Sequence, residues 1–466
     1  MSVSPTSPPD HRIRRRIGAA VKRLLPSGGR PARAVVTGFA AADLIGTLLL
    51  MLPIASESRE PTDVVTALFT ATTAVCITGL AVVDTGEHWS VFGELVILVL
   101  MQAGGLGIMT LASLLMLLLS QRMGLRMQLS AQRETRSPGL GGVRRVVAGV
   151  VKLSLGIELV AAVIVASRLM IGYDETLGSA VYSGVFHGVS AFNNAGLSLY
   201  GDSMMRFVSD PWISLTVTLA ALAGSLGFPV LFEIGRRLRG PIRWSMHTKV
   251  TLWTSGVLLG VGLVFLTVAE WGNSNTMGPL SVPSKLMAGF FAAVMTRSGG
   301  LNSLDVGAMD SASLLVQDVL MFIGGGSAST AGGIKVTTFA LLAFVMLAEF
   351  RGHRTVHVMG RRLAADVQRQ ALTIALLSVA LVMSATIVLL SLSQFSLDEV
   401  LFEAISAVAT VGLSTGITPE LPPVVHVLMS ALMFVGRLGP ITLATALALR
   451  DRPRRYELPE EQPIVG

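Results

Sequence analysis

Four short apolar runs, each followed by a Gly-Leu pair, constrain what this chain can fold into more than any other feature. The runs cover residues 62–76, 178–193, 282–296 and 397–409, and the glycines of the pairs are Gly79, Gly196, Gly300 and Gly412. At about 1.5 Å per residue, a helix of this length spans roughly 20 Å, which is too short to cross a bilayer core of about 30 Å. The runs therefore predict four re-entrant half-helices, each ending in a glycine-containing loop.

A longer apolar segment lies on each side of every short run, and each is long enough to cross a membrane, which takes about 20 residues. These eight segments cover residues 35–54, 90–119, 146–171, 211–234, 249–270, 313–349, 370–392 and 424–449. Only 14% of the chain is charged, whereas an average soluble domain is about 25% charged. We therefore expect an integral membrane protein.

The unit of helix, half-helix and helix occurs four times. Each unit crosses the membrane twice, so all four units have the same orientation, unlike the halves of transporters with inverted repeats. We expect an all-α membrane protein in which four parallel helix–re-entrant loop–helix repeats, with eight transmembrane helices, surround a central pore with pseudo-fourfold symmetry. The predicted divisions are a basic N-terminal arm (1–34), pore repeats one (35–121), two (122–235), three with a broken inner helix (236–349) and four (350–449), and a C-terminal tail (450–466). Repeats two and four each begin with a cytoplasmic loop.

The distribution of charge predicts the orientation. Basic residues gather in segments 1–34, 121–145, 235–249, 350–369 and 450–455, whereas acidic residues dominate the intervening loops. By the positive-inside rule the basic segments face the cytoplasm, so both termini are cytoplasmic in a multi-pass protein of the cell membrane. This pattern accounts for the net charge of +7 without nucleic acid. The arm lacks a cleavable apolar core, and the single Cys76 excludes an intrachain disulfide and a cysteine metal cluster.

The residues that follow the half-helices carry the predicted chemistry. Helix carboxyl ends bear partial negative charge, and glycine permits the positive φ angles that turn carbonyls toward one axis. A ring of carbonyl oxygens can replace the water shell of a cation, and such neutral dipoles suit a monovalent ion better than a divalent one. We expect an ion-binding filter at Ile77, Thr78, Gly79, Asn194, Ala195, Gly196, Ser298, Gly299, Gly300, Thr410, Val411 and Gly412.

A glycine-rich stretch, 324–333, interrupts the sixth long segment. It is not a phosphate-binding loop, because no Gly-Lys-Ser/Thr follows and its flanks are apolar. Two interpretations stay open: close helix packing through small residues, or a break in the helix whose small polar residues obstruct the pore beneath the filter. The gate residues would be Gly324, Gly325, Gly326, Ser327, Ala328, Ser329, Thr330, Ala331, Gly332, Gly333, Lys335 and Arg437.

Arg437 lies near the middle of the last long segment, where inserting an arginine costs about 2.5–3.5 kcal/mol. It must therefore face water or a partner. Either it pairs with a helix-end carbonyl or an acid, or it places a positive charge below the filter that repels cations. Lys335 either belongs to the gate or reaches toward the cytoplasmic surface. Arg297 is expected to brace the filter without touching the ion, Glu403 to brace the fourth half-helix, and His187 to be structural.

Two further features lie near the expected pore. Glycines recur at 104–107 and 224–227, at matching points of two long segments, and predict close packing or bending there. Asp84 and Glu87 follow the first Gly-Leu pair, where they either concentrate cations at the mouth of the pore or belong to an ordinary solvated loop.

The four phrases and the glycine-rich stretch together resemble the filters and the gate loop of the Trk/Ktr/HKT superfamily of potassium transporters. The phrases are Ala74-Val75-Cys76-Ile77-Thr78-Gly79-Leu80, Phe192-Asn193-Asn194-Ala195-Gly196-Leu197, Thr296-Arg297-Ser298-Gly299-Gly300-Leu301-Asn302 and Ala409-Thr410-Val411-Gly412-Leu413. The resemblance covers about 35–449. Eight crossings that begin near residue 35 are similar to a KtrB-like membrane subunit and leave no room for the two extra amino-terminal helices of TrkH.

The resemblance implies potassium uptake, often activated by sodium, with K+ at the filter glycines. It implies that the 324–333 loop and Arg437 form the gate. It also implies a homodimer on a cytosolic ring of KtrA-like nucleotide-binding regulatory subunits, so that a nucleotide acts only through that ring.

Ser298 and Gly299 depart from the Thr and Ala of many relatives. They leave open a sodium-selective or unselective monovalent cation pore of the same fold. The long segments contain no paired acids, Ser/His pair or metal motif, so we do not expect an enzyme.

Overall fold

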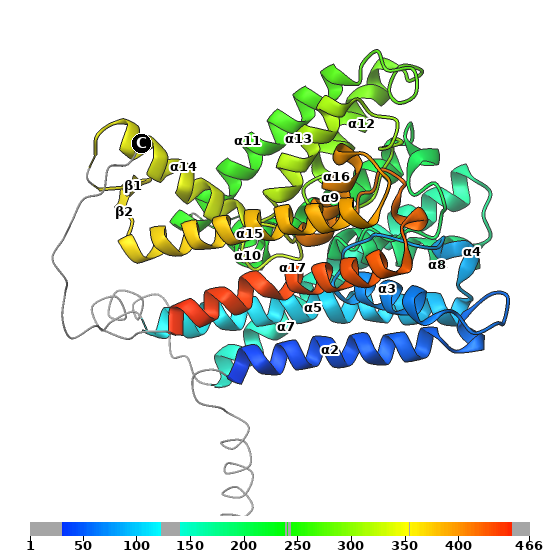
Figure 1. Ribbon diagram of the computed structural model, residues 1–466, viewed down its shortest axis with the longest axis horizontal. Coiled ribbons are helices and arrows are strands. Elements are labelled where there is room, and N and C mark those ends of the chain that lie inside the picture. The colour runs from blue at the N-terminus through cyan, green and yellow to red at the C-terminus, as the bar shows by residue number, and fades with distance from the viewer. Residues whose placement is uncertain (1–29, 123–139, 238–239, 241–243, 354, 450–466) are drawn as a thin grey trace, which may run out of the picture.

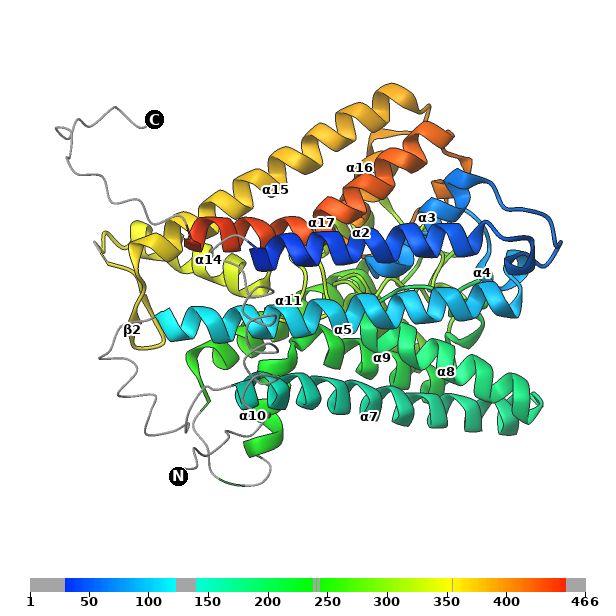
Figure 2. The same cartoon turned by 90° about the horizontal axis from the view of Figure 1, so that it is seen from below.

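The structure, a computed structural model, describes residues 30–122, 140–237, 240, 244–353 and 355–449. The predicted basic arm up to residue 29, the segment 123–139 and the tail 450–466 lie outside the described residues. The described chain is almost entirely helical, and its long helices run side by side in one general direction (Figure 1 and Figure 2).

Four short helices lie where the sequence predicts re-entrant half-helices. They are α3 (Val64–Val75), α8 (Leu177–Asn193), α12 (Val282–Met295) and α16 (Leu397–Ala409). Polar side chains cap three of their amino ends. Asp63 accepts two backbone N–H bonds, Thr176 accepts one, and Ser396 forms a capping box with Glu399. At their carboxyl ends the half-helices stop in the buried interior, just before the Gly-Leu phrases.

Each half-helix lies between longer helices of the same unit. Unit one has α2 (Arg30–Leu50) and α5 (Val91–Arg122), and unit two has α7 (Leu140–Gly172), α9 (Pro211–Leu226) and α10 (Phe228–Arg237). Unit three has α11 (Met246–Ala269), α13 (Ser311–Phe322) and α14 (Val336–Phe350), and unit four has α15 (Ala365–Leu392) and α17 (Pro423–Leu449). Shorter elements are α4 (Thr85–His88) and 3-10 turns at Pro53–Ala55, Met205–Phe207 and Thr418–Glu420.

The four units close into a ring. In each unit, the helix that follows the half-helix packs against the half-helix of the next unit. These pairs are α5 on α8, α9 on α12 and α13 on α16, while α17 packs on α3 of unit one. Phe69 and Cys76 of unit one accordingly share a hydrophobic cluster with Val425 and Met429 of α17. The ring encloses all four half-helices and brings their carboxyl ends together.

The first helix of each unit turns large apolar side chains outward. Leu44 on α2, Leu159 on α7, Val264 on α11 and Leu376 on α15 are 61–65% exposed, as suits a surface in contact with lipid. Judged by length and hydropathy within the described part of the chain, α5, α7, α11 and α15 each contain a segment that can cross a membrane, and α9 with α10 makes a fifth if counted as one bent span. The other predicted crossings are broken, or are described over shorter apolar stretches.

Two predicted crossings are not continuous helices. The segment 211–234, predicted as one crossing, instead bends by 105° between α9 and α10. Gly227 has a φ of 90° at the bend, and Pro229 lacks the N–H that would continue the helix. The matching glycines at 104–107 stay within the helix α5. The sixth segment is broken over residues 323–335, between α13 and α14.

A short hairpin departs from the expectation of an all-helical chain. Strands β1 (His357–Val358) and β2 (Arg361–Arg362) pair antiparallel around Met359 and Gly360, which both have positive φ, as a tight two-residue turn requires. Val358 packs with Val250 of α11 and with the helix α14. We call this end of the molecule, where α2 begins and α17 finishes, the hairpin end (Figure 1).

Candidate ion filter and gate

The four phrases share an alternating backbone conformation. Positive φ angles occur at Ile77 and Gly79, Asn194 and Gly196, Ser298 and Gly300, and Thr410 and Gly412. Positive φ is uncommon for residues with side chains and most strained for β-branched ones such as Ile77 and Thr410. The surrounding structure must hold this strain, which gathers at functional sites. Such alternation turns the carbonyls of a phrase toward one side of the chain.

The filter glycines predicted from the sequence meet in the structure. A Cβ atom on Gly79 would lie 2.7 Å from Cα of Gly196, one on Gly196 would lie 3.0 Å from Cα of Gly300, and one on Gly412 would lie 2.7 Å from Cα of Gly79. A Cβ atom on Gly300 would run into the carbonyl oxygen of Val411. Four loops from distant parts of the sequence therefore converge on one point that excludes side chains.

Backbone oxygens of the phrases lie beside these glycines. The Ala195 oxygen would be 2.8 Å from a Cβ on Gly79, and the Thr78 oxygen 3.1 Å from a Cβ on Gly196. The carboxyl ends of four half-helices point to the same region and add partial negative charge. The site thus presents backbone oxygens within a buried ring, the chemistry that binds a dehydrated cation.

Hydroxyl groups six residues before the glycine brace three of the four phrases. Thr73 Oγ1 accepts the backbone N–H of Gly79 at 2.9 Å, and Ser406 Oγ accepts that of Gly412 at 3.0 Å. In unit two the equivalent Ser190 donates to the Leu197 carbonyl at 2.6 Å.

Unit three has Val294 at this position and lacks the hydroxyl. Its phrase also has a different conformation, with φ of 107° at Ser298, whereas the equivalent residues of the other phrases have φ of 47–55°. The third quarter of the ring is therefore the irregular one.

The glycine-rich loop lies against the bend of unit two. The N–H of Gly326 donates to Ser225 O at 2.8 Å, and the N–H of Phe228 donates to Ala328 O at 3.2 Å. Across the loop's base, the N–H of Ile334 donates to Phe322 O at 3.0 Å. The bend at Gly227 therefore makes the space that the loop fills.

Side chains of three phrases bond to this loop or to its neighbour Arg437. Asn194 Nδ2 donates to Thr330 Oγ1 at 2.6 Å, and the N–H of Gly332 donates to Ser298 Oγ at 2.9 Å. Arg437 Nη1 donates to Thr410 Oγ1 at 3.4 Å. Ile77 occupies the equivalent position in unit one and has no polar side chain to offer. These contacts hold the loop directly behind the convergence of the phrases.

The three cations of this region bond mainly to carbonyl oxygens. Arg437 is buried and donates through Nη2 to Thr330 O at 2.6 Å, so it pairs with a carbonyl of the loop and not with the helix-end carbonyl or acid that one interpretation expected. Lys335 Nζ turns back to Ala331 O at 2.5 Å. Arg297 donates to Ser255 O at 3.2 Å and to Gly324 O at 3.1 Å. Arg437 and Arg297 thus tie the loop to neighbouring elements, whereas Lys335 closes a bond within the loop itself.

The acid of the fourth half-helix, Glu403, braces the segment that follows the fourth phrase and not only the half-helix, as the sequence suggested. Both oxygens of the buried Glu403 accept hydrogen bonds, from Ser414, from the N–H of Thr415 at 3.2 Å and from Thr418 at 2.9 Å. The carboxylate therefore holds the chain that leaves the filter.

Glycines of the last long helices admit the ends of the half-helices. A Cβ atom on Gly104, Gly224 or Gly436 would collide with the carbonyl oxygen of Val75, Phe192 or Val408, respectively. The predicted role of the glycines at 104–107 and 224–227 in close packing is therefore observed, and Gly436 adds a third instance.

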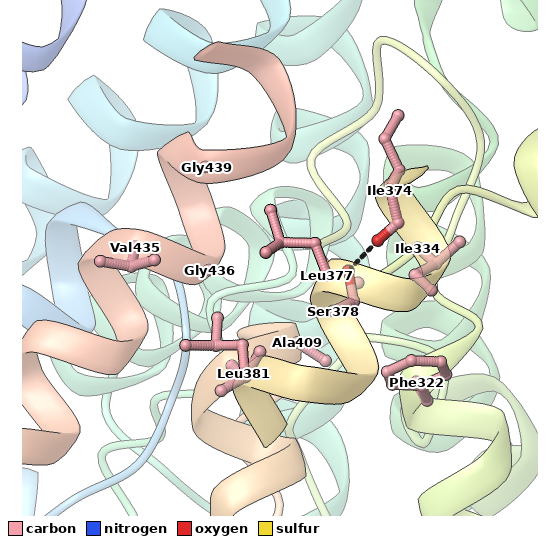
Figure 3. A pocket seen from close by; sticks show the side chains of 12 residues that line it. Phe322, Ile334, Ile374, Leu377, Ser378, Leu381, Ala409, Val435, Gly436 and Gly439 are labelled. Carbon is pink, nitrogen blue, oxygen red and sulfur yellow. Dashed lines mark hydrogen bonds between the residues drawn. The ribbon is translucent and has the colours of Figure 1, made fainter. Parts of the chain in front are cut away.

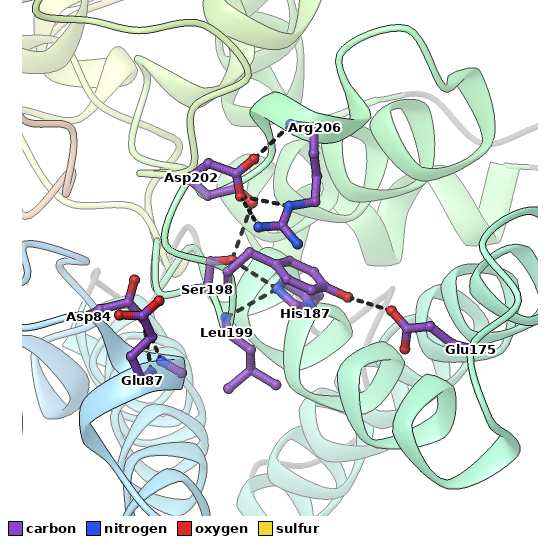
Figure 4. Close-up of polar contacts among 11 residues, drawn as sticks. Asp84, Glu87, Glu175, His187, Ser198, Leu199, Asp202 and Arg206 are labelled. Carbon is purple, nitrogen blue, oxygen red and sulfur yellow. Dashed lines mark hydrogen bonds and ion pairs between the residues drawn. The ribbon is translucent and has the colours of Figure 1, made fainter. Parts of the chain in front are cut away.

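Polar residues beyond the second phrase form a structural network at the end opposite the hairpin (Figure 4). His187 bonds to Ser183 O at 2.7 Å and to Ser198 Oγ at 3.0 Å, and its ring stacks on Tyr200 at 5.0 Å between centroids. Asp84 caps the helix α4, accepting the N–H of Glu87 at 3.1 Å. His187 is thus a satisfied structural histidine, and Asp84 has a local structural role.

A small, largely apolar cavity, partly open to the surroundings, lies behind the fourth quarter (Figure 3). Phe322 and Ile334 at the ends of the loop, Leu377 and Leu381 of α15, and Ala409 line it. Ala409 precedes the fourth phrase, and the residues at the equivalent positions of units two and three have the larger side chains of asparagine and arginine. The small side chain at this position helps to leave the space open.

The ring of half-helices and the convergent phrases place the protein in the class of membrane transporters with re-entrant loops. The family described as TrkH, cation transport protein, matches residues 32–454. The chain is 38% identical to "Ktr system potassium uptake protein B" of Bacillus subtilis (strain 168), over 94% of this chain and 97% of the relative. It is 32% identical to "Potassium/sodium uptake protein NtpJ" of Enterococcus hirae, over 94% and 97%.

The fold is also that of a solved structure, the potassium transporter TrkH from Vibrio parahaemolyticus. The TM-score is 0.68 at 18% identity, covering 90% of this chain and 85% of that one. The chain belongs to the TrkH family and is a Trk/Ktr-type membrane subunit, so the predicted membership is confirmed. The predicted fold, with four parallel pore-loop repeats, is confirmed as well. These relatives are named as ion transporters, in agreement with the prediction that the chain is not an enzyme.

Proposed function

We propose that this chain is the membrane subunit of a potassium uptake system. K+ would exchange its water shell for the backbone oxygens of the four phrases, and the 324–333 loop with Lys335 and Arg437 would control its passage. The observation that carries this proposal is the meeting of Gly79, Gly196, Gly300 and Gly412 in one ring. The names of the relatives, which are potassium uptake proteins, support K+ as the ion.

The filter would work through neutral dipoles. The strained positive φ angles at Ile77 and Thr410 are retained because the folded ring over-determines them. Their effect is to aim carbonyl oxygens where the half-helix ends already attract a cation. A ring of this kind favours a monovalent ion that loses its water readily, which supports the assignment of Ile77, Thr78, Asn194, Ala195, Ser298, Gly299, Thr410 and Val411 to the filter with the four glycines.

The gate would work by obstruction and by charge. The loop is buried and bonded to Asn194 and Ser298, and the Arg437 guanidinium bonds to Thr330 O within it. In this arrangement a positive charge and a plug of small residues lie behind the filter. Because glycines make up half of residues 324–333, the backbone of the loop can rotate readily once these hydrogen bonds break.

The hairpin end would face the cytoplasm, so that ions move from the opposite end of the molecule, where the half-helices begin, toward the hairpin. The arginines of β2 and of the adjoining segments support this orientation through the positive-inside rule. A homodimer on a cytosolic ring of KtrA-like nucleotide-binding subunits, and activation by sodium, would complete the system. The word "system" in the names of the Ktr relatives supports a partner subunit.

A sodium-permeable pore of the same fold is the second candidate. It is favoured by the irregular third quarter, where Val294 supplies no brace and Ser298 has its own conformation. The name of the relative NtpJ, which includes both ions, points the same way.

The test is rubidium and sodium uptake by a bacterium that lacks potassium uptake and expresses this chain. Gly79→Ser and Gly412→Ser should lower the rubidium-to-sodium ratio about tenfold or more, since each inserts a side chain where Cβ has no room. Deletion of 326–331 should raise the uptake of both ions. Unchanged uptake in the serine variants and in the deletion, at equal membrane protein level, would refute the assignment.

A further inference from the structure

A buried carboxylate lies behind the second quarter of the filter, in the middle of an apolar helix. Glu158 is on α7, is 4% exposed, and is in contact with Gln102 of α5 and Asn193 of α8. Asn193 is the last residue of its half-helix and directly precedes the filter residue Asn194. The three side chains therefore join the first two units at the point where the second phrase begins.

Hydrogen bonds fix the orientation of each group in this cluster. Val189 O can only accept, so the Asn193 amide that lies 3.0 Å from it presents its NH2 group. The same NH2 donates to Gln102 Oε1 at 2.8 Å, which in turn fixes Gln102 with its own NH2 toward Glu158. Gln102 Nε2 then donates to Glu158 Oε2 at 3.0 Å and Oε1 at 3.2 Å. The backbone carbonyl of Val189 thus fixes the orientation of Asn193, Asn193 fixes that of Gln102, and Gln102 presents its NH2 group to Glu158.

Glu158 is an acceptor in every one of these contacts. Asn193 Nδ2 also lies 3.2 Å from Glu158 Oε1, so its two hydrogens are shared among three acceptors. A protonated carboxyl group would need an acceptor for its O–H, and the oriented amides offer it N–H groups. The network therefore fits the ionised form of Glu158.

An ionised carboxylate in an apolar helix is costly unless a positive charge compensates it. The three ion pairs formed among the described residues do not include Glu158. Asn193, which contacts Glu158, directly precedes the filter residue Asn194 of the second phrase. Two amide donors lower the cost of burial without cancelling the charge, so the field of Glu158 acts on whatever cation occupies the filter.

We propose that Glu158 is the counter-charge of the monovalent cation in the filter and sets the affinity for that ion, with Gln102 and Asn193 as its positioning residues. The inference rests on the proposed function. The Asn193 Oδ1 atom has no hydrogen-bond partner, and a Cβ atom on Gly105 would lie 2.6 Å from Asn193 Cγ. The chain thus leaves one polar atom unsatisfied and relies on a glycine to keep this amide in its position.

The test is the concentration of rubidium that gives half-maximal uptake by cells expressing the full chain. Glu158→Gln should raise this concentration about tenfold, because a unit charge is lost from a poorly screened position near the ion. The maximal rate, normalised to the amount of protein in the membrane, should change much less. A role in packing alone would lower the amount of protein or the maximal rate and leave half-saturation unchanged.

Two further variants complete the design. The double variant Gln102→Glu/Glu158→Gln exchanges amide and carboxylate across the α5–α7 contact, and Asn193 can still donate to residue 102. It should return half-saturation to within about threefold of the wild type. The control Glu94→Gln removes a different buried carboxylate, which lies on α5 and accepts from Tyr182. Glu94 lies eight residues before Gln102, about 12 Å along that helix. It should leave half-saturation unchanged.

The outcomes separate this inference from the proposed function. Wild-type half-saturation in Glu158→Gln, or no recovery in the exchanged pair, overturns the role of Glu158 while rubidium uptake and the effect of Gly79→Ser persist. If Glu158→Gln does not reach the membrane, the double variant Gln102→Glu/Glu158→Gln tests the proposal. Half-saturation of the double variant at the wild-type concentration supports the role of Glu158 as counter-charge, and a tenfold higher concentration overturns that role. Absence of rubidium uptake by the wild type would instead refute the proposed function.

Discussion

At the scale of single residues, and on the proposed function, the geometry of three of the four filter quarters depends on one hydroxyl group each. Thr73 and Ser406 each hold the N–H of a filter glycine, and Ser190 holds the same turn from the other side. These bonds offset the strain of positive φ at the residues before the glycines. Val294 cannot do so, and the third phrase is the one whose backbone deviates. We infer that selectivity is limited by this quarter.

Replacing Val294 with threonine should therefore regularise the third quarter. The two side chains have nearly the same shape, and the new hydroxyl would compete for the Gly300 N–H, which now donates to Met295 O at a long 3.3 Å. We expect the rubidium-to-sodium uptake ratio to rise two- to fivefold, the effect of about 0.5–1 kcal/mol from one hydrogen bond. Thr73→Val is the matched reverse change and should lower the ratio to a similar extent. The prediction fails if both variants shift the ratio in the same direction.

At the scale of elements, the 324–333 loop is hydrogen-bonded to the phrases of units two and three. Thr330 accepts from Asn194 and its hydroxyl lies 3.3 Å from Phe192 O, so this one loop residue contacts the end of α8 and the phrase that follows it. On the proposed function, the loop cannot leave the pore without releasing Asn194, which has positive φ. Opening of the gate would then loosen the second quarter of the filter.

Thr330→Val tests this coupling. Valine keeps the shape of threonine but loses the bonds to Asn194 Nδ2 and Phe192 O, which weakens the loop's buried position by about 1–3 kcal/mol. We expect rubidium uptake to rise about tenfold and the rubidium-to-sodium ratio to fall. Thr330→Ser keeps the hydroxyl and should resemble the wild type. A rise in uptake with an unchanged ion ratio would show that gate and filter are independent.

Regular elements were predictable from the sequence, and contacts between distant segments were not. The half-helices were predicted from apolar runs too short to cross a membrane. Their carboxyl ends were predicted from the glycine-containing phrases around Gly79 and Gly412. In contrast, the glycines at 104–107 and 224–227 look alike in sequence, yet only the second set bends, because Pro229 follows it.

The contact between Asn194 and Thr330 joins residues 136 positions apart, so no local pattern could indicate it. For Glu158 a signal was present, a single acid within the apolar segment 146–171. Its partner Gln102 lies 56 residues away and required the structure.

At the scale of the whole molecule, the ring of four units fixes the side from which every half-helix enters. The loops that lead from α2 into α3 and from α11 into α12 lie at the end opposite the hairpin. The hairpin carries Arg361 and Arg362, and its packing on α11 and α14 joins it to the helix that leaves the gate loop. A force applied at the hairpin end by a cytosolic partner would therefore reach the loop through α14, which begins directly after Lys335.

This arrangement depends on the hairpin end facing the cytoplasm, which cysteine labelling can establish. The single native Cys76 is buried, so it provides a quiet background. Glu60→Cys and Asn275→Cys place exposed thiols in loops that lead into α3 and α12, and Met359→Cys places one in the hairpin turn, where the native side chain is 42% exposed. A membrane-impermeant maleimide should label the first two variants in intact cells and the third only after permeabilisation, because basic segments stay on the cytoplasmic side. Labelling of Met359→Cys in intact cells would reverse the proposed orientation and, with it, the assignment of this face to a cytosolic regulatory ring.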